Sequence, residues 1–405
     1  MEQKFDVILY GASGFTGRQT VAYFHRNAPK SLRWAIAGRN REKLESISQT
    51  YAPDVPRSIL IADGDDVDAL TSLCRQTRVI LTTAGPFSKY GRNLVDACVL
   101  HGTHYVDITG ETPFAADLIA AHHETAEANG TRIIPFSGFD SVPSDLGAFV
   151  CADYFRNRGT GTRRVFGSFK MRGGLNGGTV ATALEMATSG RMKALRNVLL
   201  LNPKTRQDKA ERRESADLTW PIHDPLKERW IAPFVMAPIN TRVVRRSNAL
   251  FAQKDQGYGT QFRYQEGYEA GGRFVATCVS LGLATFDFLL KSSAGRAIIR
   301  LLTPSPGRGP SEAKMDGGFF RCRLFAEGDD GSRIMVTLSS SGDPGNRVTV
   351  AALCESALAL AADGVALPGG DEYGGILTPA TGLGQVLVDR LTSIGWSFEI
   401  EEIDT

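Results

Sequence analysis

Short apolar runs alternate with amphipathic stretches over roughly the first third of the chain. The apolar runs have the length and the β-rich composition of strands, while the stretches between them place apolar residues at helical spacing. The expected strands are Phe5–Tyr10, Leu32–Ala37, Ser58–Ala62, Val79–Thr83, Tyr105–Ile108 and Arg132–Phe136. The expected helices are Gly17–Arg26, Arg41–Tyr51, Asp66–Gln76, Gly91–His101 and Phe114–Asn129. Repeated βα units predict a doubly wound parallel sheet with helices on both faces, over residues 1–140.

The pattern changes from about residue 141. Strand-like runs at 163–171, 262–268, 319–327 and 333–340 lack regular helices between them, which predicts an α+β second domain with an antiparallel sheet over 141–345. Helices are expected at 349–362 and 379–394, with a final strand at 396–403. Residues 191–217 mix both charge signs and predict a solvated helix, with docking to an acidic carrier protein as the alternative. Residues 303–318 are Pro/Gly-rich and predict a loop.

One longer apolar stretch, Phe274–Leu290, stands out in the second domain. It falls just short of the ~18 residues expected of a membrane span and contains Asp287. We therefore predict no transmembrane span. Packing in the core is the favoured interpretation, while a wall for a long acyl chain and contact with a membrane surface stay open.

Composition and charge remove several classes of protein. The 405 residues are 42% hydrophobic and 22% charged, which is typical of a globular chain, and the net charge of +2 gives no overall attraction to nucleic acid. Six cysteines without a C-x-x-C pair predict buried thiols and no disulfide framework or zinc site. The adjacent His122 and His123 would face different directions on a helix, so no metal is expected. The start MEQKFDVILYG lacks the features of a signal peptide, which predicts a cytoplasmic location.

A glycine-rich turn, Gly11-Ala12-Ser13-Gly14-Phe15-Thr16-Gly17, follows the first expected strand and opens the first helix. Gly11 permits a tight turn, Gly14 allows close approach of a pyrophosphate, and Gly17 allows close packing of helix on sheet. The N–H groups at the helix start, around Ser13, Phe15 and Thr16, would bind the phosphates. The turn thus predicts a Rossmann-type dinucleotide site.

The end of the second strand indicates which dinucleotide binds. An NAD site usually carries an acidic residue there, whereas this chain has Ala37-Gly38-Arg39-Asn40. Arg39 can pair with a 2′-phosphate and stack on adenine, so NADP(H) is the expected cofactor, with Asn40 beside it. Asp63, after the third strand, is either an adenine contact or a turn-forming residue.

The segment after the fourth strand is expected to hold the nicotinamide half of the cofactor. Thr83-Ala84-Gly85-Pro86 supplies small residues at the carboxyl end of a strand, where ligands of such folds bind. Tyr90, shortly after it, is a candidate donor near the reacting centre, although packing as an ordinary aromatic side chain is the alternative.

Several segments together resemble one family. The glycine-rich turn, Gly85-Pro86-Phe87 with Tyr90-Gly91, the run His104–Glu111 and the run Gly138–Asp145 are similar to the saccharopine dehydrogenase-like group. The runs Ala237–Asn248 and Gly374–Ala380 are similar to its bacterial trans-acting enoyl reductases. The resemblance, which extends nearly end to end, implies a Rossmann domain, an inserted α+β domain, and a C-terminal segment (346–405) that packs back on the first domain. It also implies reduction of an enoyl group on an acyl chain held by a carrier protein or synthase, in lipid or polyketide synthesis.

Enoyl-thioester reduction needs a donor for the thioester oxygen and a proton for the α-carbon. The candidate catalytic residues are Tyr90, Asn240 and Arg242, with Asp140 as an orienting or acid/base group. The neighbouring Arg245 and Arg246 are interpreted as surface charges. Reduction of an imine or carbonyl, and a non-catalytic NADP-binding scaffold associated with lipid, are the alternative functions, and a homodimer stays open.

Overall fold

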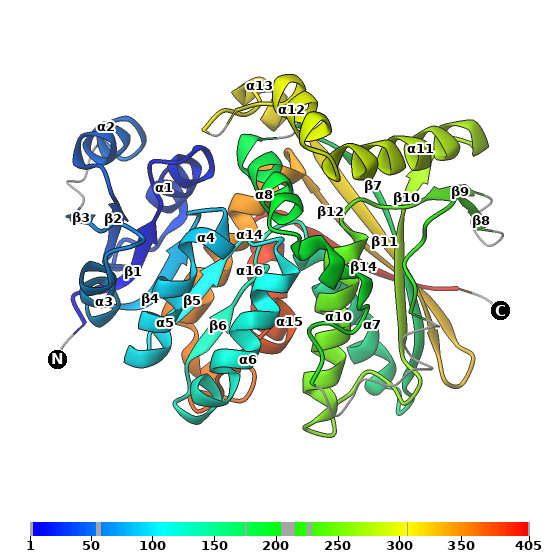
Figure 1. Ribbon diagram of the computed structural model, residues 1–405. Helices are drawn as coiled ribbons and strands as arrows, with labels where there is room; N and C mark the ends of the chain where they lie inside the picture. The colour runs from blue at the N-terminus through cyan, green and yellow to red at the C-terminus, as the bar shows by residue number, and fades with distance from the viewer. Residues whose placement is uncertain are drawn as a thin grey trace.

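The computed structural model describes residues 3–53, 58–174, 176–203, 215–224, 229–305 and 307–403. It contains two seven-stranded sheets that lie side by side (Figure 1). Of the charged segment 191–217, residues 204–214 lie outside the described residues, and Arg191–Arg196 forms a single 3-10 helix. The structure therefore describes only part of the segment for which a solvated helix is predicted.

The first sheet is the predicted parallel sheet, and all its strand pairs run parallel. Its strands lie in the order β13-β6-β5-β4-β1-β2-β3. Strands β2 and β3 are added on one side of β1 and strands β4, β5 and β6 on the other, so the strand order reverses between β1 and β4. Such a reversal is where open α/β sheets bind ligands, beyond the carboxyl ends of the strands. The strands are β1 (Phe5–Tyr10), β2 (Trp34–Gly38), β3 (Ser58–Ile61), β4 (Thr77–Thr82), β5 (His104–Asp107), β6 (Arg132–Ile134) and β13 (Gly375–Ile376).

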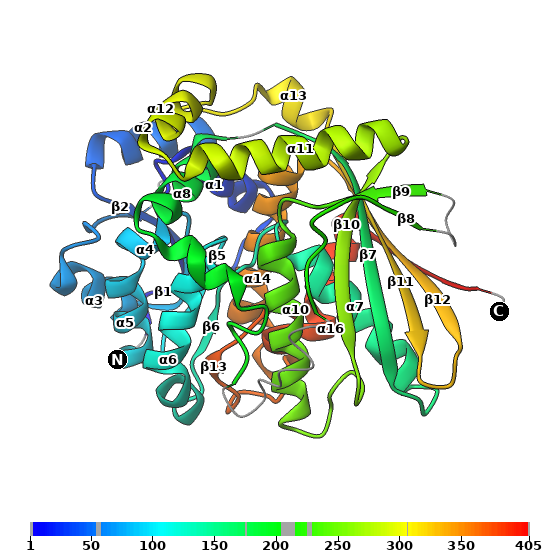
Figure 2. The same ribbon diagram turned by 45° about the vertical axis from the view of Figure 1, so that its right-hand side comes forward.

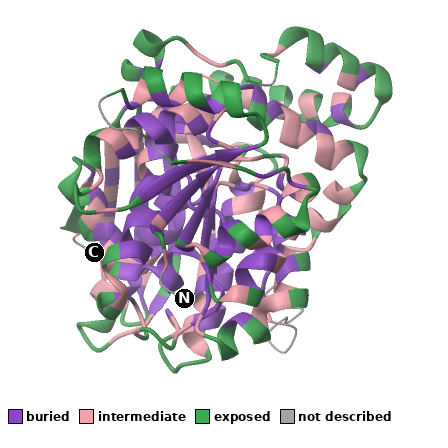
Figure 3. Ribbon diagram, turned by 90° about the vertical axis from the view of Figure 1, so that its left-hand side faces the viewer, coloured by how far each residue is buried: buried purple, intermediate pink, exposed green. Residues whose placement is uncertain are grey.

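Helices cover both faces of this sheet, as predicted. One face packs against α1, α2 and α14, and the other against α3, α5 and α6. Figure 3 shows the strands buried beneath helices whose outer turns are exposed. The helices are α1 (Phe15–Asn27), α2 (Arg41–Tyr51), α3 (Val67–Arg75), α4 (Phe87–Tyr90), α5 (Arg92–His101), α6 (Thr112–Ala128) and α14 (Thr349–Ala362).

The second sheet is mixed, and the prediction of an antiparallel sheet is wrong at one pair. Strands β7 and β10 run parallel, because α8 and α10 lie between them in the sequence and carry the chain back to the same end. All other pairs are antiparallel. The order is β14 (Ser397–Glu402), β12 (Arg333–Ser341), β11 (Phe319–Gly328), β7 (Thr162–Arg172), β10 (Arg263–Ala270), β9 (Arg229–Ala232) and β8 (Ile222–Asp224).

Helices α7 and α10 pack on the second sheet and join it to the first. One continuous core includes Leu146 of α7, Leu324 of β11 and Leu353 of α14, so the two sheets share buried apolar side chains. The remaining helices are α7 (Val142–Arg156), α8 (Gly177–Thr188), α10 (Ala237–Ala252), α11 (Arg273–Leu290), α12 (Ser293–Leu302), α13 (Glu312–Asp316), α15 (Pro379–Gly382) and α16 (Gly384–Ser393).

The C-terminal segment is divided between the two sheets. Helix α14 lies on β4 and β5, and β13 extends the first sheet beside β6. The last strand, β14, instead pairs with β12 at the edge of the second sheet. The segment therefore fastens the two sheets to each other rather than belonging to the first alone.

Helix α11 contradicts the expectation of core packing for residues 274–290. It buries Ala276, Ser280 and Leu290, whereas Phe274 is 81% exposed and Phe288 is 71% exposed. Among the described residues, one helix has the length and the apolar composition needed to cross a membrane, and this helix is α11. Of the predicted loop 303–318, the described residues 303–305 and 307–318 form a loop except for the short α13.

Candidate functional site

The glycine-rich turn connects β1 to α1 at the carboxyl edge of the first sheet. Gly11 has a φ of +81°, a conformation that favours glycine, and a Cβ there would lie 2.9 Å from the backbone nitrogen of Ala84. A Cβ on Gly17 would overlap the carbonyl oxygen of Gly11. The turn can therefore close only with glycine at both positions, as the sequence pattern predicts.

The start of α1 fits the phosphates of a dinucleotide. Gly14 is the N-cap residue and provides no side-chain cap, and the first turn carries no acidic side chain. The N–H groups of Phe15, Thr16 and Gly17 begin the helix, where helical geometry provides no partner for them. Together with the positive end of the helix dipole, these groups make an anion site, with the partly exposed Ser13 beside it.

The segment after β4 packs directly on the glycine-rich turn. The Thr83 hydroxyl donates to the Gly11 carbonyl at 3.2 Å, and the Gly85 N–H donates to the Thr83 carbonyl at 3.0 Å. Ala84 lies against Gly11, and Pro86 is the N-cap residue of α4. The two segments that the sequence assigns to the cofactor thus share one edge of the sheet.

Glu111 holds this segment in place, a role that the residue pattern did not reveal. Its buried carboxylate accepts from the Phe87 N–H at 2.6 Å and from the Ser88 N–H at 3.0 Å, at the start of α4. Its own N–H donates to Thr109. The family-like run His104–Glu111 contained the residue, but its partners lie more than 20 positions away, so spacing could not identify them.

Arg39 follows β2 and is exposed, in the position expected to bind a 2′-phosphate. The neighbouring Asn40 caps α2 by accepting from the Lys43 N–H at 2.9 Å, so its side chain is already engaged. Asp63 accepts from the Asp65 N–H at 3.3 Å, which matches the turn-forming alternative. Burial, with the Asp63 charge nearby, raises the pKa of Tyr10 to about 12.

We expect Arg39→Ala to weaken NADPH binding about 10–100-fold and to leave NADH binding nearly unchanged. A charge-assisted bond to phosphate contributes about 1.5–3 kcal/mol, and NADH lacks the 2′-phosphate. Cofactor titration by fluorescence measures both. Arg41→Ala is the control, because Arg41 lies on the exposed side of α2 near Glu45. An equal loss of both cofactors in Arg39→Ala would exclude the 2′-phosphate role.

Tyr90 lies near the end of β3, where the adenosine half of the cofactor is expected. A Cβ on Gly64, just beyond β3, would lie 3.7 Å from the Tyr90 Cβ and 3.7 Å from the Tyr10 hydroxyl. The Lys89 ammonium sits 5.1 Å from the centre of the Tyr90 ring. This position favours the packing alternative over a donor at the reacting centre, because β3 is at the end of the sheet opposite to β6.

Asp140 occupies the turn between β6 and α7, on the side of the same edge where the nicotinamide half of the cofactor is expected. The residue is partly exposed. Burial of its carboxyl group raises the pKa of Asp140 to about 6, since the charged form is poorly solvated there. With this pKa the carboxyl group is protonated in about one molecule in ten at pH 7, far more often than an ordinary aspartate, so it can act as a proton donor.

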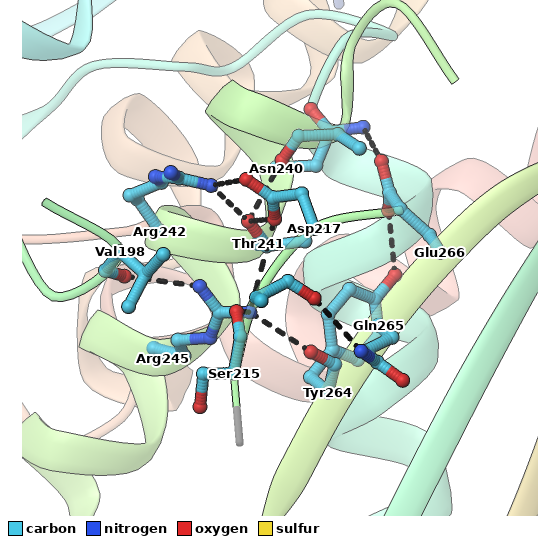
Figure 4. A network of polar contacts seen from close by, with 12 residues as sticks. Val198, Ser215, Asp217, Asn240, Thr241, Arg242, Arg245, Tyr264, Gln265 and Glu266 are labelled. Atoms are coloured by element: carbon cyan, nitrogen blue, oxygen red, sulfur yellow. Dashed lines mark hydrogen bonds and ion pairs between the residues drawn. The ribbon is translucent and has the colours of Figure 1, made fainter. Parts of the chain in front are cut away.

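Asn240 belongs to a buried network directly behind this turn (Figure 4). Its amide donates to Glu266 at 2.8 Å and accepts from the Ser141 hydroxyl at 3.3 Å. Glu266 also accepts from Ser144 and Tyr264, and burial raises its pKa to about 7. With no exposed surface, Asn240 is suited to position the residue after Asp140 rather than to contact substrate.

Three arginines on α10 donate to backbone carbonyls of other segments, and Figure 4 shows two of them, Arg242 and Arg245. Arg242 pairs with Asp217 and donates to the Leu195 carbonyl at 2.6 Å. Arg245 and Arg246 are 3% and 1% exposed, so the interpretation of these two as surface charges is wrong. The pattern of charged residues along the sequence does not reveal that distant backbone carbonyls accept hydrogen bonds from these arginines. Their partners are the carbonyls of Val198, Ser215 and Tyr264 for Arg245, and of Leu201 and Ile376 for Arg246.

Arg246→Ala should destabilise the protein by about 2–5 kcal/mol. The change leaves two buried carbonyls without donors, each costing about 1–3 kcal/mol. Burial already lowers the pKa of Arg246 to about 10, which reflects how little water reaches the group. Urea unfolding measures the loss. The control is Arg163→Ala, whose exposed ion pair with Glu327 should change stability by about 0.5 kcal/mol or less. Equal losses of stability in the two variants would contradict a stabilising role for the hydrogen bonds from Arg246 to the two carbonyls.

Comparison with known proteins decides the family. The sequence profile of the saccharopine dehydrogenase NADP binding domain matches residues 7–134. Proteins named trans-acting enoyl reductase are similar over nearly the whole length: one from Mycobacterium leprae is 35% identical over 97% of both chains, and one from Mycobacterium tuberculosis is 34% identical over 97% of both. The chain belongs to the saccharopine dehydrogenase-like oxidoreductases. It is an NADP-dependent enzyme of that family.

Solved structures agree on the fold of this oxidoreductase. Saccharopine dehydrogenase from Saccharomyces cerevisiae aligns over 99% of this chain and 100% of its own, with a TM-score of 0.55 and 14% identity. Homospermidine synthase from Legionella pneumophila aligns over 99% and 92%, with a TM-score of 0.55 and 10% identity. At these identities the likeness concerns the fold and not the substrate.

Proposed function

We propose that the protein is a trans-acting enoyl reductase, which reduces an α,β-unsaturated acyl thioester carried by an acyl carrier protein or a synthase. The observation that carries the proposal is a buried carboxyl group, Asp140, on the same sheet edge as the cofactor turn. The substrate class is supported by the names of relatives that match nearly end to end.

The bound cofactor would supply hydride to the β-carbon of the enoyl group. The protein must then deliver a proton to the α-carbon, so that one double bond is exchanged for two C–H bonds. Asp140 is the proposed proton donor, because its raised pKa leaves it protonated far more often near neutral pH than an ordinary aspartate, and mostly protonated below about pH 6. Ser141, Asn240 and Glu266 form the support behind it and keep its turn in position.

The glycine-rich turn and the Thr83–Pro86 segment would orient the cofactor across the edge. Glu111 fixes the second of these by its two backbone bonds. Positioning of this kind contributes to rate because reacting atoms are held close before the reaction begins. Arg242 is proposed as a structural residue, since its guanidinium already contacts Asp217 and a carbonyl.

Mass spectrometry of enoyl thioesters incubated with protein and NADPH tests the function. A gain of two hydrogens with consumption of NADPH is the expected result, and deuterium from C4-labelled NADPH should appear at the β-carbon. An amine or alcohol product from imine or carbonyl substrates would replace the proposal with the saccharopine-type reaction. Binding of NADPH without turnover of any acceptor, with or without carrier protein, would favour the scaffold.

A further inference from the structure

Helices α11 and α12 form a hairpin along the outer edge of the molecule (Figures 1 and 2). The inner side of α11 packs on β9 and β10, and the corner between α11 and α12 packs on α8 through Leu290 and Ile299. A Cβ on Gly295 would overlap the Leu289 carbonyl, so the corner is tight. The hairpin is thus a fixed part of the fold.

The outer side of the hairpin is apolar and exposed. On α11, positions 274, 278, 281, 285 and 288 recur at helical spacing and all face solvent. On α12, Leu301 is 84% exposed and Leu302 is 76% exposed. Scattered exposed apolar residues are ordinary, but seven of the 17 large ones in the described chain fall within this hairpin. They are Phe274, Val275, Leu281, Phe288, Ile298, Leu301 and Leu302.

The same hairpin and the loop after it are strongly basic. Residues 273–308 contain five cations and one acid, a net charge of +4, whereas the whole chain carries +2. The acid, Asp287, pairs with Lys291 at 2.5 Å. The guanidinium of Arg296 donates to the neutral Leu290 carbonyl rather than to an acidic side chain. Three further cations of this stretch are exposed: Arg273, Arg300 and Arg308.

We propose that the hairpin α11–α12 is a docking surface for an anionic lipid bilayer. Helices that lie in the membrane interface combine an apolar side with basic residues, which attract the negative lipid surface. A second copy of this chain would oppose one basic hairpin with another. The hairpin lies on an outer edge of the molecule (Figure 2), and its apolar side chains are exposed, so a fluid bilayer can surround them without a matching groove.

The docking surface is connected to the cofactor turn. The Arg308 carbonyl accepts from the Gly177 N–H at 3.0 Å, and a Cβ on Gly309 would overlap the ring of Phe15. Residues 307–311 therefore reach from the hairpin to the start of α1. A docked protein would hold its cofactor edge near the lipid surface. The proposed membrane docking does not depend on which substrate the enzyme reduces, because its test measures only binding to lipid vesicles.

Sedimentation with vesicles tests the proposal. We expect the full chain to pellet with vesicles of equal parts phosphatidylcholine and phosphatidylglycerol, and to stay in solution with phosphatidylcholine alone. The variant Phe274→Ser/Phe288→Ser/Leu301→Ser should bind at least about tenfold more weakly. No sedimentation of the wild-type chain with anionic vesicles, or equal binding of this variant, would overturn the proposal.

Matched controls separate apolar contact, charge and folding. Val67→Ser/Leu100→Ser/Val365→Ser removes the same kind of exposed side chain elsewhere and should leave vesicle binding unchanged. Arg273→Gln/Arg300→Gln should weaken binding to anionic vesicles and reduce its salt dependence. Retained NADPH affinity in every variant shows that the fold is intact. A salt-independent interaction would overturn the charge argument.

Cys278 provides a direct readout from the surface itself. It is exposed on the outer side of α11, whereas the other five cysteines are buried, so an environment-sensitive thiol dye should label it selectively. Anionic vesicles should shift the dye emission to the blue, and Cys278→Ser should abolish the signal. A shift caused by self-association, lost on dilution and unaffected by vesicles, would assign the surface to a second copy. A shift with an acyl carrier protein but not with vesicles would assign it to that partner.

Discussion

Asp140→Asn is expected to lower kcat for enoyl reduction about 10²–10⁴-fold, the contribution of a positioned proton donor. Asparagine has the shape of the protonated carboxyl group, so the turn between β6 and α7 should keep its structure. NADPH affinity should stay unchanged, since the glycine-rich turn lies at β1. Steady-state kinetics, cofactor titration and thermal unfolding together separate catalysis from folding.

The pH dependence has a definite sign. Burial raises the pKa of Asp140 to about 6, so the proton needed by the reaction is present below that pH and is lost above it. Wild-type kcat should therefore fall as pH rises through about 6, and this limb should be missing from the residual activity of Asp140→Asn. Asp153→Asn, a change of a partly exposed side chain on α7, the helix that follows the Asp140 turn, is the control. A wild-type rate and profile in Asp140→Asn would remove Asp140 from the mechanism.

Gly17→Ala is expected to weaken NADPH binding roughly 100-fold, equivalent to one or two charge-assisted hydrogen bonds. The added Cβ would overlap the Gly11 carbonyl and lie 2.8 Å from the Ala12 Cα, both of them backbone atoms. The turn must shift, which misaligns the helix N–H groups and costs about 1–3 kcal/mol of stability. Calorimetric titration with NADPH and urea unfolding measure the two effects.

Gly282→Ala is the matched control for this substitution. It adds the same atom to a helix interior where nothing lies within 4 Å, so NADPH affinity should be unchanged. Stability should rise by about 1 kcal/mol at most, because alanine favours helix more than glycine does. Normal NADPH affinity in Gly17→Ala would show that the glycine-rich turn does not hold the cofactor phosphates.

The first sheet could be predicted because its signals are local. Each of its strands from β1 to β6 is a short apolar run, and the glycine-rich turn requires nothing beyond neighbouring residues. The parallel pairing of β7 with β10 and the placement of β14 were missed, since both depend on segments far apart in sequence. Local pattern specifies an element but not its neighbour.

The candidate site shows the same division. Asp140 and the cofactor segments follow strand ends, which sequence spacing can find. The roles of Glu111, Asn240 and Arg246 depend on partners at distances of 23 to 130 positions along the chain. The prediction that residues 274–290 pack in the core was wrong, because an apolar composition is equally compatible with a core helix and with an exposed one.

The return of the C-terminal segment to the first sheet has a consequence for synthesis of the chain. Strand β6 ends at Ile134, and α14 begins 215 residues later, at Thr349. At roughly 5–20 residues per second, the ribosome needs about 10–40 s to produce that interval. During this time the apolar face formed by Val79, Leu81 and Val106 lacks its covering helix. The nascent first domain therefore exposes an apolar surface, of the kind that chaperones bind, until translation is nearly finished.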